Sequence, residues 1–467
     1  MTAAQEAILE QIIEAFQNGK RLSDLPDVSG TNPFNLICEV LEDGESKKAA
    51  LATLLPYMEE QCSYGIEFDT AVSSPACTRI GNLPIHNRMK GCLLDDNGEV
   101  VEYLNPTNWT GQTRDGSRGQ VMVELPMHYR KFETDGTKRR VRISEYPLPG
   151  YHLVGKRYVS AYEATVKRST TTLCSVANMD ADYRGGSNNA AWDGSYRTLL
   201  GRPATVISRT NFRNYARKRK AGSTEWNCMT YDIHKELYWL FVIEYATLNS
   251  QAGFNAQKDN NGYAQGGLGN GVTNTPDWNG FNSFYPFVPC GYTDELGNAS
   301  GEVAYTMLKE DGTTHGTVKV PRYRGVENPF GHIWQWTDGI NIRISPNAPT
   351  GDGLSKVFVC TDPSKFKDNG YDGYSHVGNE ARTEGYVKEV IFGENGEIMP
   401  AAVGAGTTTY FCDYHYTSIP AAETLRGVLF GGSAYNGAYA GFASANTGNV
   451  PSYTYAYIGS RLCFIPA

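Results

Sequence analysis

The sequence predicts an α+β protein, and three features of the 467-residue chain support this. Short runs of β-forming residues alternate with hairpin turns in its middle part. Residues 211–220 and 232–248 carry helical patterns. A Gly- and Asn-rich stretch over residues 260–280 indicates long loops. Helices, short strands and long loops mixed along one chain are typical of the α+β class.

Composition indicates a folded, loop-rich protein long enough for about three domains. The chain holds 50 glycines and 22 prolines, about 15% of its residues, which is below the roughly 25% of low-complexity chains. The net charge of −8 is spread without long blocks, so we expect neither nucleic acid nor an anionic membrane surface as a partner. No signal-peptide pattern opens the chain and no apolar run approaches about 18 residues, so we expect no secretion by a signal peptide and no membrane insertion.

The ten cysteines are scattered and include no CxxC pair. This spacing gives no indication of a zinc or redox motif. We therefore expect buried free thiols in a reducing compartment.

Residues 1–61 are predicted to form a helical segment for attachment and oligomerisation. Thr2 and Gln5 fit a capping box, and an apolar stripe from Ile8 to Phe16 precedes Gly19, which ends the first helix. A second helical pattern covers residues 46–60, where Pro56 would kink or shorten it. Such stripes pack either within one subunit or, because this segment is too short for its own core, between subunits.

Residues 62–150 are predicted to form a small β-rich domain. Asn97-Gly98 and Asp135-Gly136 are hairpin dipeptides between β-forming runs. Pro147, Pro149 and Gly150 then indicate a linker to a third domain at residues 151–467.

The third domain resembles the formylglycine-generating-enzyme family, a large variant of the C-type lectin fold. Five matching stretches occur in the family's order. They are a stretch with the Tyr-Glu-Ala-Thr motif (158–166), an Arg-Pro pair with a helix (202–216), a helix that begins with Trp (226–246), an Asn-Pro-Phe-Gly element (325–338), and a closing element from Arg-Gly to Gly-Ser-Arg (426–464). The resemblance implies a C-type-lectin-like fold for this part of the chain.

A narrower resemblance concerns residues 430–464. This region looks like the variable region of proteins diversified by retroelements, of the major-tropism-determinant type found in phage tails. In that family adenine-directed mutagenesis alters asparagine-type codons, which implies candidate ligand-binding positions here: Ser433, Tyr435, Asn436, Tyr439, Ser444, Asn446, Gly448, Asn449, Tyr453, Tyr455 and Tyr457. The small residues between them look like a fixed scaffold: Gly432, Ala434, Gly437, Ala438, Gly441, Pro451 and Gly459.

Residues 433–457, called the display segment below, have the composition of an antibody paratope. They include no charged side chain, and 14 of the 25 are Tyr, Ser, Gly or Asn. Tyr453, Tyr455 and Tyr457 alternate with smaller residues, so an extended run would place their rings on one face. That face is either displayed outward or packed inward with each hydroxyl paired; packing of the small Thr454 and Ala456 against the core favours display.

Catalysis and metal binding have little support in the sequence. The namesake enzymes oxidise a substrate cysteine with a cysteine pair that holds copper, whereas Cys412 and Cys463 here lack that context, and the apolar surroundings of Cys463 indicate core. The eight histidines show no ligand-type spacing. Trp334 and Trp336 lie in a stretch that resembles lectin calcium motifs, but we expect core aromatics there. We therefore expect no enzyme and no cofactor, and leave structural calcium open.

The resemblances together imply a phage or prophage tail protein that binds a protein or glycan receptor on the host surface. They also imply a homotrimer that joins other tail proteins through its N-terminal segment and belongs to the virion after assembly in the bacterial cytoplasm. A structural tail component and a bacterial protein with a fixed ligand are the alternatives.

Overall fold

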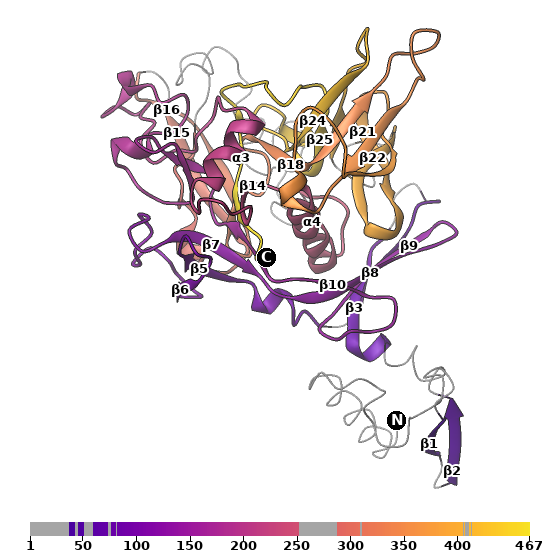
Figure 1. Cartoon of the computed structure of the whole chain (residues 1–467). Coiled ribbons are helices and arrows are strands. Elements are labelled where there is room, and N and C mark those ends of the chain that lie inside the picture. The colour runs from indigo at the N-terminus through magenta and orange to yellow at the C-terminus, as the bar shows by residue number, and fades with distance from the viewer. Residues whose placement is uncertain are drawn as a thin grey trace.

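The computed structural model describes residues 59–72, 76–80, 82–251, 287–308, 311–404, 406, 411 and 413–467, and the backbone of residues 37–42 and 45–50. These residues are mostly β-sheet with few helices (Figure 1). Strands β1 (Ile37–Glu42) and β2 (Glu45–Ala50) pair as an antiparallel hairpin.

The helix predicted over residues 46–60 is wrong over its first part. Residues 46–50 belong to β2, and helical structure is described only at residues 59–62. Backbone pairing with β1 overrides the helical apolar spacing, and the Asp43-Gly44 dipeptide between the strands is a hairpin signal that the periodicity argument missed. The helix predicted to end at Gly19 lies outside the described residues.

A five-stranded sheet in the order β10-β8-β9-β3-β4 forms part of the lower layer of the molecule as drawn in Figure 1. Its strands are β3 (Ser63–Asp69), β4 (Thr78–Ile80), β8 (His128–Asp135), β9 (Lys138–Ser144) and β10 (His152–Val154). The predicted hairpin at Asp135-Gly136 is confirmed: it joins β8 to β9, and Gly136 has φ +57°.

A six-stranded sheet in the order β14-β27-β11-β7-β5-β6 joins distant parts of the chain. Its strands are β5 (Lys90–Leu94), β6 (Val100–Tyr103), β7 (Gln120–Leu125), β11 (Arg157–Ser160), β14 (Trp226–Cys228) and β27 (Leu462–Phe464). The hairpin predicted at Asn97-Gly98 lies between β5 and β6. Because β7 pairs with β11, the predicted linker at residue 150 connects two parts that share a sheet and a hydrophobic core.

The largest sheet has the order β20-β19-β18-β24-β25-β23-β21-β22, with β26 added in parallel beside β18. Its strands are β18 (Trp334–Ile344), β19 (Ser355–Val359), β20 (Ser375–Asn379), β21 (Gly385–Phe392), β22 (Glu397–Val403), β23 (Tyr414–Tyr416), β24 (Thr424–Gly431), β25 (Gly441–Asn446) and β26 (Ile458–Gly459). Smaller sheets contain β12 (Thr165–Lys167) and β13 (Thr172–Cys174), and β15 (Gly301–Leu308), β16 (Thr314–Tyr323) and β17 (Val326–Glu327).

Two α-helices lie near the positions that the sequence predicts. Helix α3 (Arg209–Arg217) begins after Ser208, whose side chain accepts a hydrogen bond from the Asn211 N–H. Helix α4 (Tyr231–Tyr245) begins after Thr230, which caps it in the same way, and ends where Ala246 turns left-handed. Short 3-10 helices cover His86–Arg88, Ala181–Tyr183, Ala190–Trp192, Asp294–Leu296, Pro363–Lys365, Gly393–Asn395 and Gly437–Tyr439.

Helix α4 lies at the centre of the molecule, between the five-stranded sheet and the large sheet (Figure 1). It is buried along most of its length because it packs on both sheets, as expected for a helix that is apolar on most sides. Trp239 packs against Phe68 of β3, Phe132 of β8 and Phe392 of β21, with ring centroids 5.6–6.5 Å apart. None of the helices in the described part of the chain is long and apolar enough to cross a membrane.

Candidate display surface

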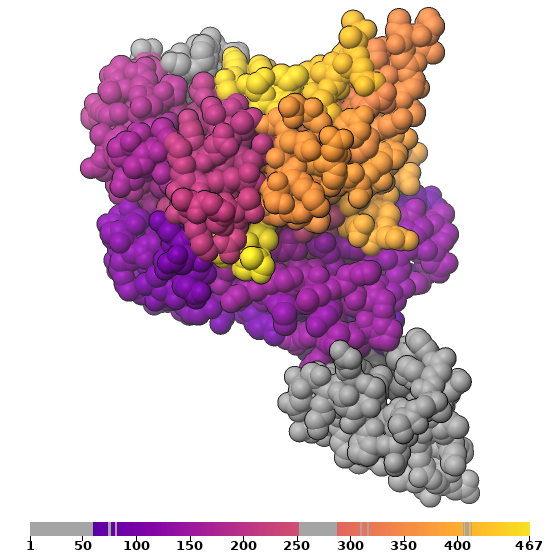
Figure 2. Space-filling view, in the orientation of Figure 1, coloured from indigo at the N-terminus to yellow at the C-terminus, as the bar shows by residue number. Residues whose placement is uncertain are grey.

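The display segment connects β24 to β26 through the short helix Gly437–Tyr439 and strand β25. Figure 2 shows most of the C-terminal part of the chain, in yellow, on the upper face of the molecule, opposite the violet strands of the lower layer. The ends of the segment are fixed in the large sheet, because β24 and β26 both pair with β18. The segment therefore begins and ends at strands that share β18 as a partner.

The small residues predicted to be scaffold are all buried: Gly432, Ala434, Gly437, Ala438, Gly441, Pro451 and Gly459. Three of the glycines leave no room for a side chain. A Cβ at Gly441 would lie 1.8 Å from Asp413 Oδ1, one at Gly459 2.4 Å from Ile333 Cδ1, and one at Gly432 2.9 Å from Ala440 Cα. A side chain at these positions would collide with the buried Asp413 and Ile333 side chains or with the Ala440 backbone, so glycine is required there, as a scaffold role implies.

Four of the predicted ligand-binding tyrosines are exposed. Tyr435 retains 53% of its accessible surface, Tyr439 41%, Tyr455 38% and Tyr453 37%. The Tyr453 and Tyr455 rings are nearly parallel, at 8°, with centroids 6.3 Å apart. Exposure without charge makes these side chains available for contact with a partner.

Tyr457 differs from its two neighbours because its ring is half-buried against the hydrophobic core, 4.5 Å from the Tyr455 ring. The run from Tyr453 to Tyr457 is also not a strand, contrary to the extended geometry we considered. Its carbonyls instead accept isolated hydrogen bonds: Tyr455 O from the N–H groups of Val206 and Ile458, and Tyr457 O from the Trp334 N–H. Outward display of the ring is thus observed for Tyr453 and Tyr455, whereas the Tyr457 ring packs between Tyr455 and the core.

Two of the predicted positions are internal. Ser433 is buried, and its hydroxyl donates to Asn436 Oδ1 at 2.9 Å. Ser444 is buried in β25, and its hydroxyl donates to the carbonyls of Tyr439 and Tyr414. A serine can be reached from an asparagine-type codon by adenine changes and still be buried in the protein. Residue type alone therefore does not distinguish exposed from buried positions.

The remaining predicted positions are half-buried and partly structural. Asn436 accepts from the Ser433 N–H at 2.7 Å and donates through Nδ2 to the Tyr416 hydroxyl at 2.9 Å. Asn446 Oδ1 accepts from the Gly448 N–H at 2.9 Å and from Asn449 Nδ2 at 3.3 Å. These side chains shape the turns that hold the exposed tyrosines.

Three tyrosines that sequence reasoning missed lie beside the display segment. Tyr386 of β21 and Tyr414 and Tyr416 of β23 pack around Tyr439, and together these four residues are called the tyrosine cluster below. The ring centroids of Tyr439 lie 4.5 Å from Tyr414, 5.4 Å from Tyr386 and 6.5 Å from Tyr416. The Tyr-His-Tyr alternation at residues 414–416 is the sequence signal that could have found two of them.

Two phenol groups beneath the exposed rings, those of Tyr457 and Tyr416, have raised pKa values. Burial and the nearby Tyr453, Tyr455 and Tyr435 raise the pKa of Tyr457 to about 12. Burial likewise raises the pKa of Tyr416 above its ordinary range, against the opposing effect of the Asn436 hydrogen bond. These two groups are therefore neutral at pH 7, and each hydroxyl can both donate and accept a hydrogen bond.

Two buried carboxyl groups lie beneath the surface. Asp413 accepts from the Ser250 hydroxyl at 3.0 Å, and burial raises its pKa to about 7. Glu380 accepts from the Thr447 hydroxyl at 3.0 Å, and burial raises its pKa to about 8. Both groups contact the strands or loops that carry the tyrosines, so their protonation affects the stability of this layer.

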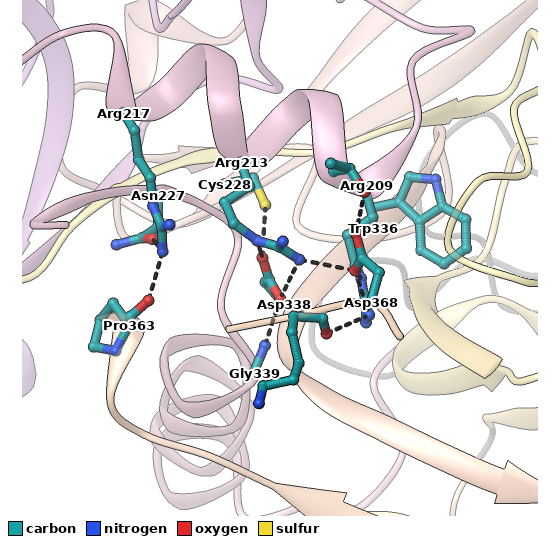
Figure 3. Close-up of polar contacts among 12 residues, drawn as sticks. Arg209, Arg213, Arg217, Asn227, Cys228, Trp336, Asp338, Gly339, Pro363 and Asp368 are labelled. Carbon is teal, nitrogen blue, oxygen red and sulfur yellow. Dashed lines mark hydrogen bonds and ion pairs between the residues drawn. The ribbon is translucent and has the colours of Figure 1, made fainter. Parts of the chain in front are cut away.

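A buried network of arginine and aspartate side chains anchors helix α3 to β18 (Figure 3). Arg213 forms an ion pair with Asp338 and a second with Asp368, at 2.8 Å. Arg209 donates to Asp368 at 2.7 Å and to the Ile340 carbonyl at 2.8 Å. The network sits on the strand that holds both ends of the display segment, and is called the arginine network below.

The residues considered for copper or calcium chemistry lie in the core where the structure describes them. Cys463 is fully buried with its sulfur 3.6 Å from the Met229 sulfur, and Cys412 lies outside the described residues. Trp334 and Trp336 are buried, which confirms the core interpretation. The eight cysteines described are free thiols, six of them buried. Within the described ranges no three His, Cys, Asp or Glu side chains converge as a metal site requires.

Comparison with known proteins leaves the family undetermined. No family model matches the chain, and no curated protein matches it. Among solved structures, the chain is similar to the "Major Tropism Determinant M1 Variant", with 12% identity over 91% of this chain and 90% of that one and a TM-score of 0.22. It is also similar to the "Major Tropism Determinant P3c Variant", with 14% identity over 91% of this chain and 89% of that one and a TM-score of 0.21.

Proposed function

We propose that this chain is a receptor-binding protein of a phage or prophage tail, and that its C-type-lectin-like domain displays a diversified surface for attachment to a host. The observation that carries this proposal is that buried and exposed positions are separated by residue type within residues 432–459. The small residues expected to be constant are buried, whereas Tyr435, Tyr439, Tyr453 and Tyr455 are exposed. Such a division lets contact residues change without changing the fold.

Binding at this surface is non-covalent. Tyrosine rings bury a large area at a small loss of side-chain entropy, and neutral hydroxyl groups adapt their hydrogen bonds to different partners. A homotrimer attached to the tail through the N-terminal segment would present several surfaces together. Several weak contacts made at once can bind far more tightly than one, so a modest affinity per surface suffices.

Virions purified from the source of the sequence provide the test. We expect antibody raised against the full chain to label one end of the tail, and the soluble full chain to compete with those virions for adsorption to their host. Label on the capsid, or adsorption unaffected by saturating soluble chain, would favour a structural component. Light scattering is expected to give three times the 51.4 kDa chain mass.

A further inference from the structure

The four exposed tyrosines of the display segment are too few for a protein interface. Taking about 200 Å² for a fully exposed tyrosine, they offer on the order of 340 Å² together. A stable protein interface buries roughly 800 Å² on each partner. If the display segment binds a protein, neighbouring residues must supply much of the contact area.

The other members of the tyrosine cluster are continuous with the display segment. Strand β23 pairs in parallel with β25, so Tyr416 lies opposite Asn446, and Tyr386 lies opposite Tyr414 on the next strand. His415 between them is buried, whereas Tyr414 and Tyr416 lie on the opposite, half-exposed face of the strand. Tyr439 contacts all three rings and thus links the two areas.

We propose that Tyr386, Tyr414 and Tyr416 form a fixed patch that completes the binding surface, and that fixed patch and display segment together contact an uncharged, amphipathic area of a folded protein. This rests on the proposed function of the display segment. The three residues precede residues 430–464, so diversification of that region leaves them unchanged. The fixed patch supplies affinity common to all variants, and the display segment selects among partners.

The chemistry of the surface determines the kind of partner. The display segment carries no charge, so a charged partner area would lose its water without gaining an ion pair. Clustered tyrosines in the centre of an interface are typical of the residues that contribute most to protein binding. An area that combines apolar groups with neutral hydrogen-bonding groups therefore fits the display segment and the rings of the fixed patch, beside which the exposed Glu384 adds one negative charge.

A display library tests the proposal with defined probes. The full chain, randomised at Tyr435, Tyr439, Tyr453 and Tyr455 to Tyr, Ser, Asn or Asp, is selected against ubiquitin as a folded protein and separately against dextran as a glycan. Tyr386→Ser, Tyr414→Ser and Tyr414→Phe are then introduced into the ubiquitin binders. The matched control is Tyr371→Ser, because Tyr371 is also a surface tyrosine in a ring stack, 4.2 Å from Phe358 of β19, away from the tyrosine cluster.

We expect ubiquitin binders whose affinity falls at least tenfold with Tyr386→Ser or Tyr414→Ser and less than twofold with Tyr371→Ser. Tyr414→Phe keeps the ring and is expected to retain most of the affinity, which separates loss of contact from loss of folding. Changes below twofold at Tyr386 and Tyr414 would show that these rings only pack together. Binders to dextran alone would overturn the partner class, and no binders at all would overturn the surface itself. Natural variation of the locus, measured separately, tests the proposed function.

Discussion

The arginine network and the display segment lie on the same sheet but are built in opposite ways. The arginine network holds charged groups away from water, each paired with an opposite charge or a carbonyl, so one substitution leaves a partner unpaired. The display segment has no charge; four of its five tyrosines are exposed, whereas Phe442 and the small scaffold residues are buried. Tolerance to substitution is therefore low in one region and high at selected positions of the other.

The largest contrast is expected from Asp338→Ala. Removing this carboxylate leaves Arg213 buried beside Asp368 alone, and we expect the free energy of unfolding to fall by about 3–5 kcal/mol in urea titration. The control is Glu423→Ala, which removes an ion-pair partner of Arg343 that is 51% exposed, and should cost less than about 1 kcal/mol. Equal losses in the two variants would mean that the network does not stabilise the scaffold.

Gly441→Ala tests the scaffold of the display segment. The added Cβ would lie 1.8 Å from Asp413 Oδ1, so we expect a loss of about 1–3 kcal/mol from overpacking. Gly448→Ala is the matched control, because its nearest neighbour would be Asn446 Oδ1 at 3.3 Å, and the expected change is within about 0.5 kcal/mol. Thermal unfolding of both variants measures the difference. A Gly441→Ala variant as stable as the original chain would contradict the tight packing of Asp413 against Gly441.

Glu380→Gln tests the buried carboxyl beneath the surface. The pKa of Glu380 is raised to about 8 from an ordinary value of 4.5, so the folded state prefers the protonated group. The stability it contributes is complete below pH 4.5 and is lost as the pH rises through 8. Because Gln cannot ionise, we expect the variant to lose about 1–2 kcal/mol less stability than the original chain between pH 7 and pH 8.5. Parallel profiles for the two proteins would contradict the raised pKa.

The smallest effect is expected from Tyr435→Ser. This exposed ring contributes little packing, so the unfolding free energy should change by less than about 0.5 kcal/mol. Tyr457→Ser removes a half-buried ring that packs on the core, and a loss of about 1–2 kcal/mol is expected. If Tyr435→Ser is the more damaging of the two, the division between exposed and supporting tyrosines is wrong.

The sequence predicted those features that depend on local pattern. Hairpins at Asn97-Gly98 and Asp135-Gly136 follow from dipeptide chemistry, and α3 and α4 follow from helical spacing and their N-caps. The burial of Gly432, Gly441 and Gly459 agrees with the scaffold role given to them.

Features that depend on pairing between distant residues escaped sequence analysis. Residues 46–50 follow a helical pattern but form β2, because β1 supplies the backbone partners. Ser433 and Ser444 share the composition of the exposed positions yet are buried, since a small polar residue can satisfy its hydrogen bonds on either side of a loop. Tyr386 is more than 40 residues from the display segment, and only the β21–β23 pairing brings it there.

Deep sequencing of this locus across a population of the source tests the central claim most directly. We predict substitutions concentrated at Tyr435, Tyr439, Tyr453 and Tyr455, where the side chains are exposed, with Gly432, Gly441 and Gly459 unchanged. Tyr386 and Asp338, outside the display segment, should also be unchanged. An invariant display segment, or substitutions spread equally over its buried and exposed positions, would contradict the account and leave a fixed ligand or a structural role as the better explanation.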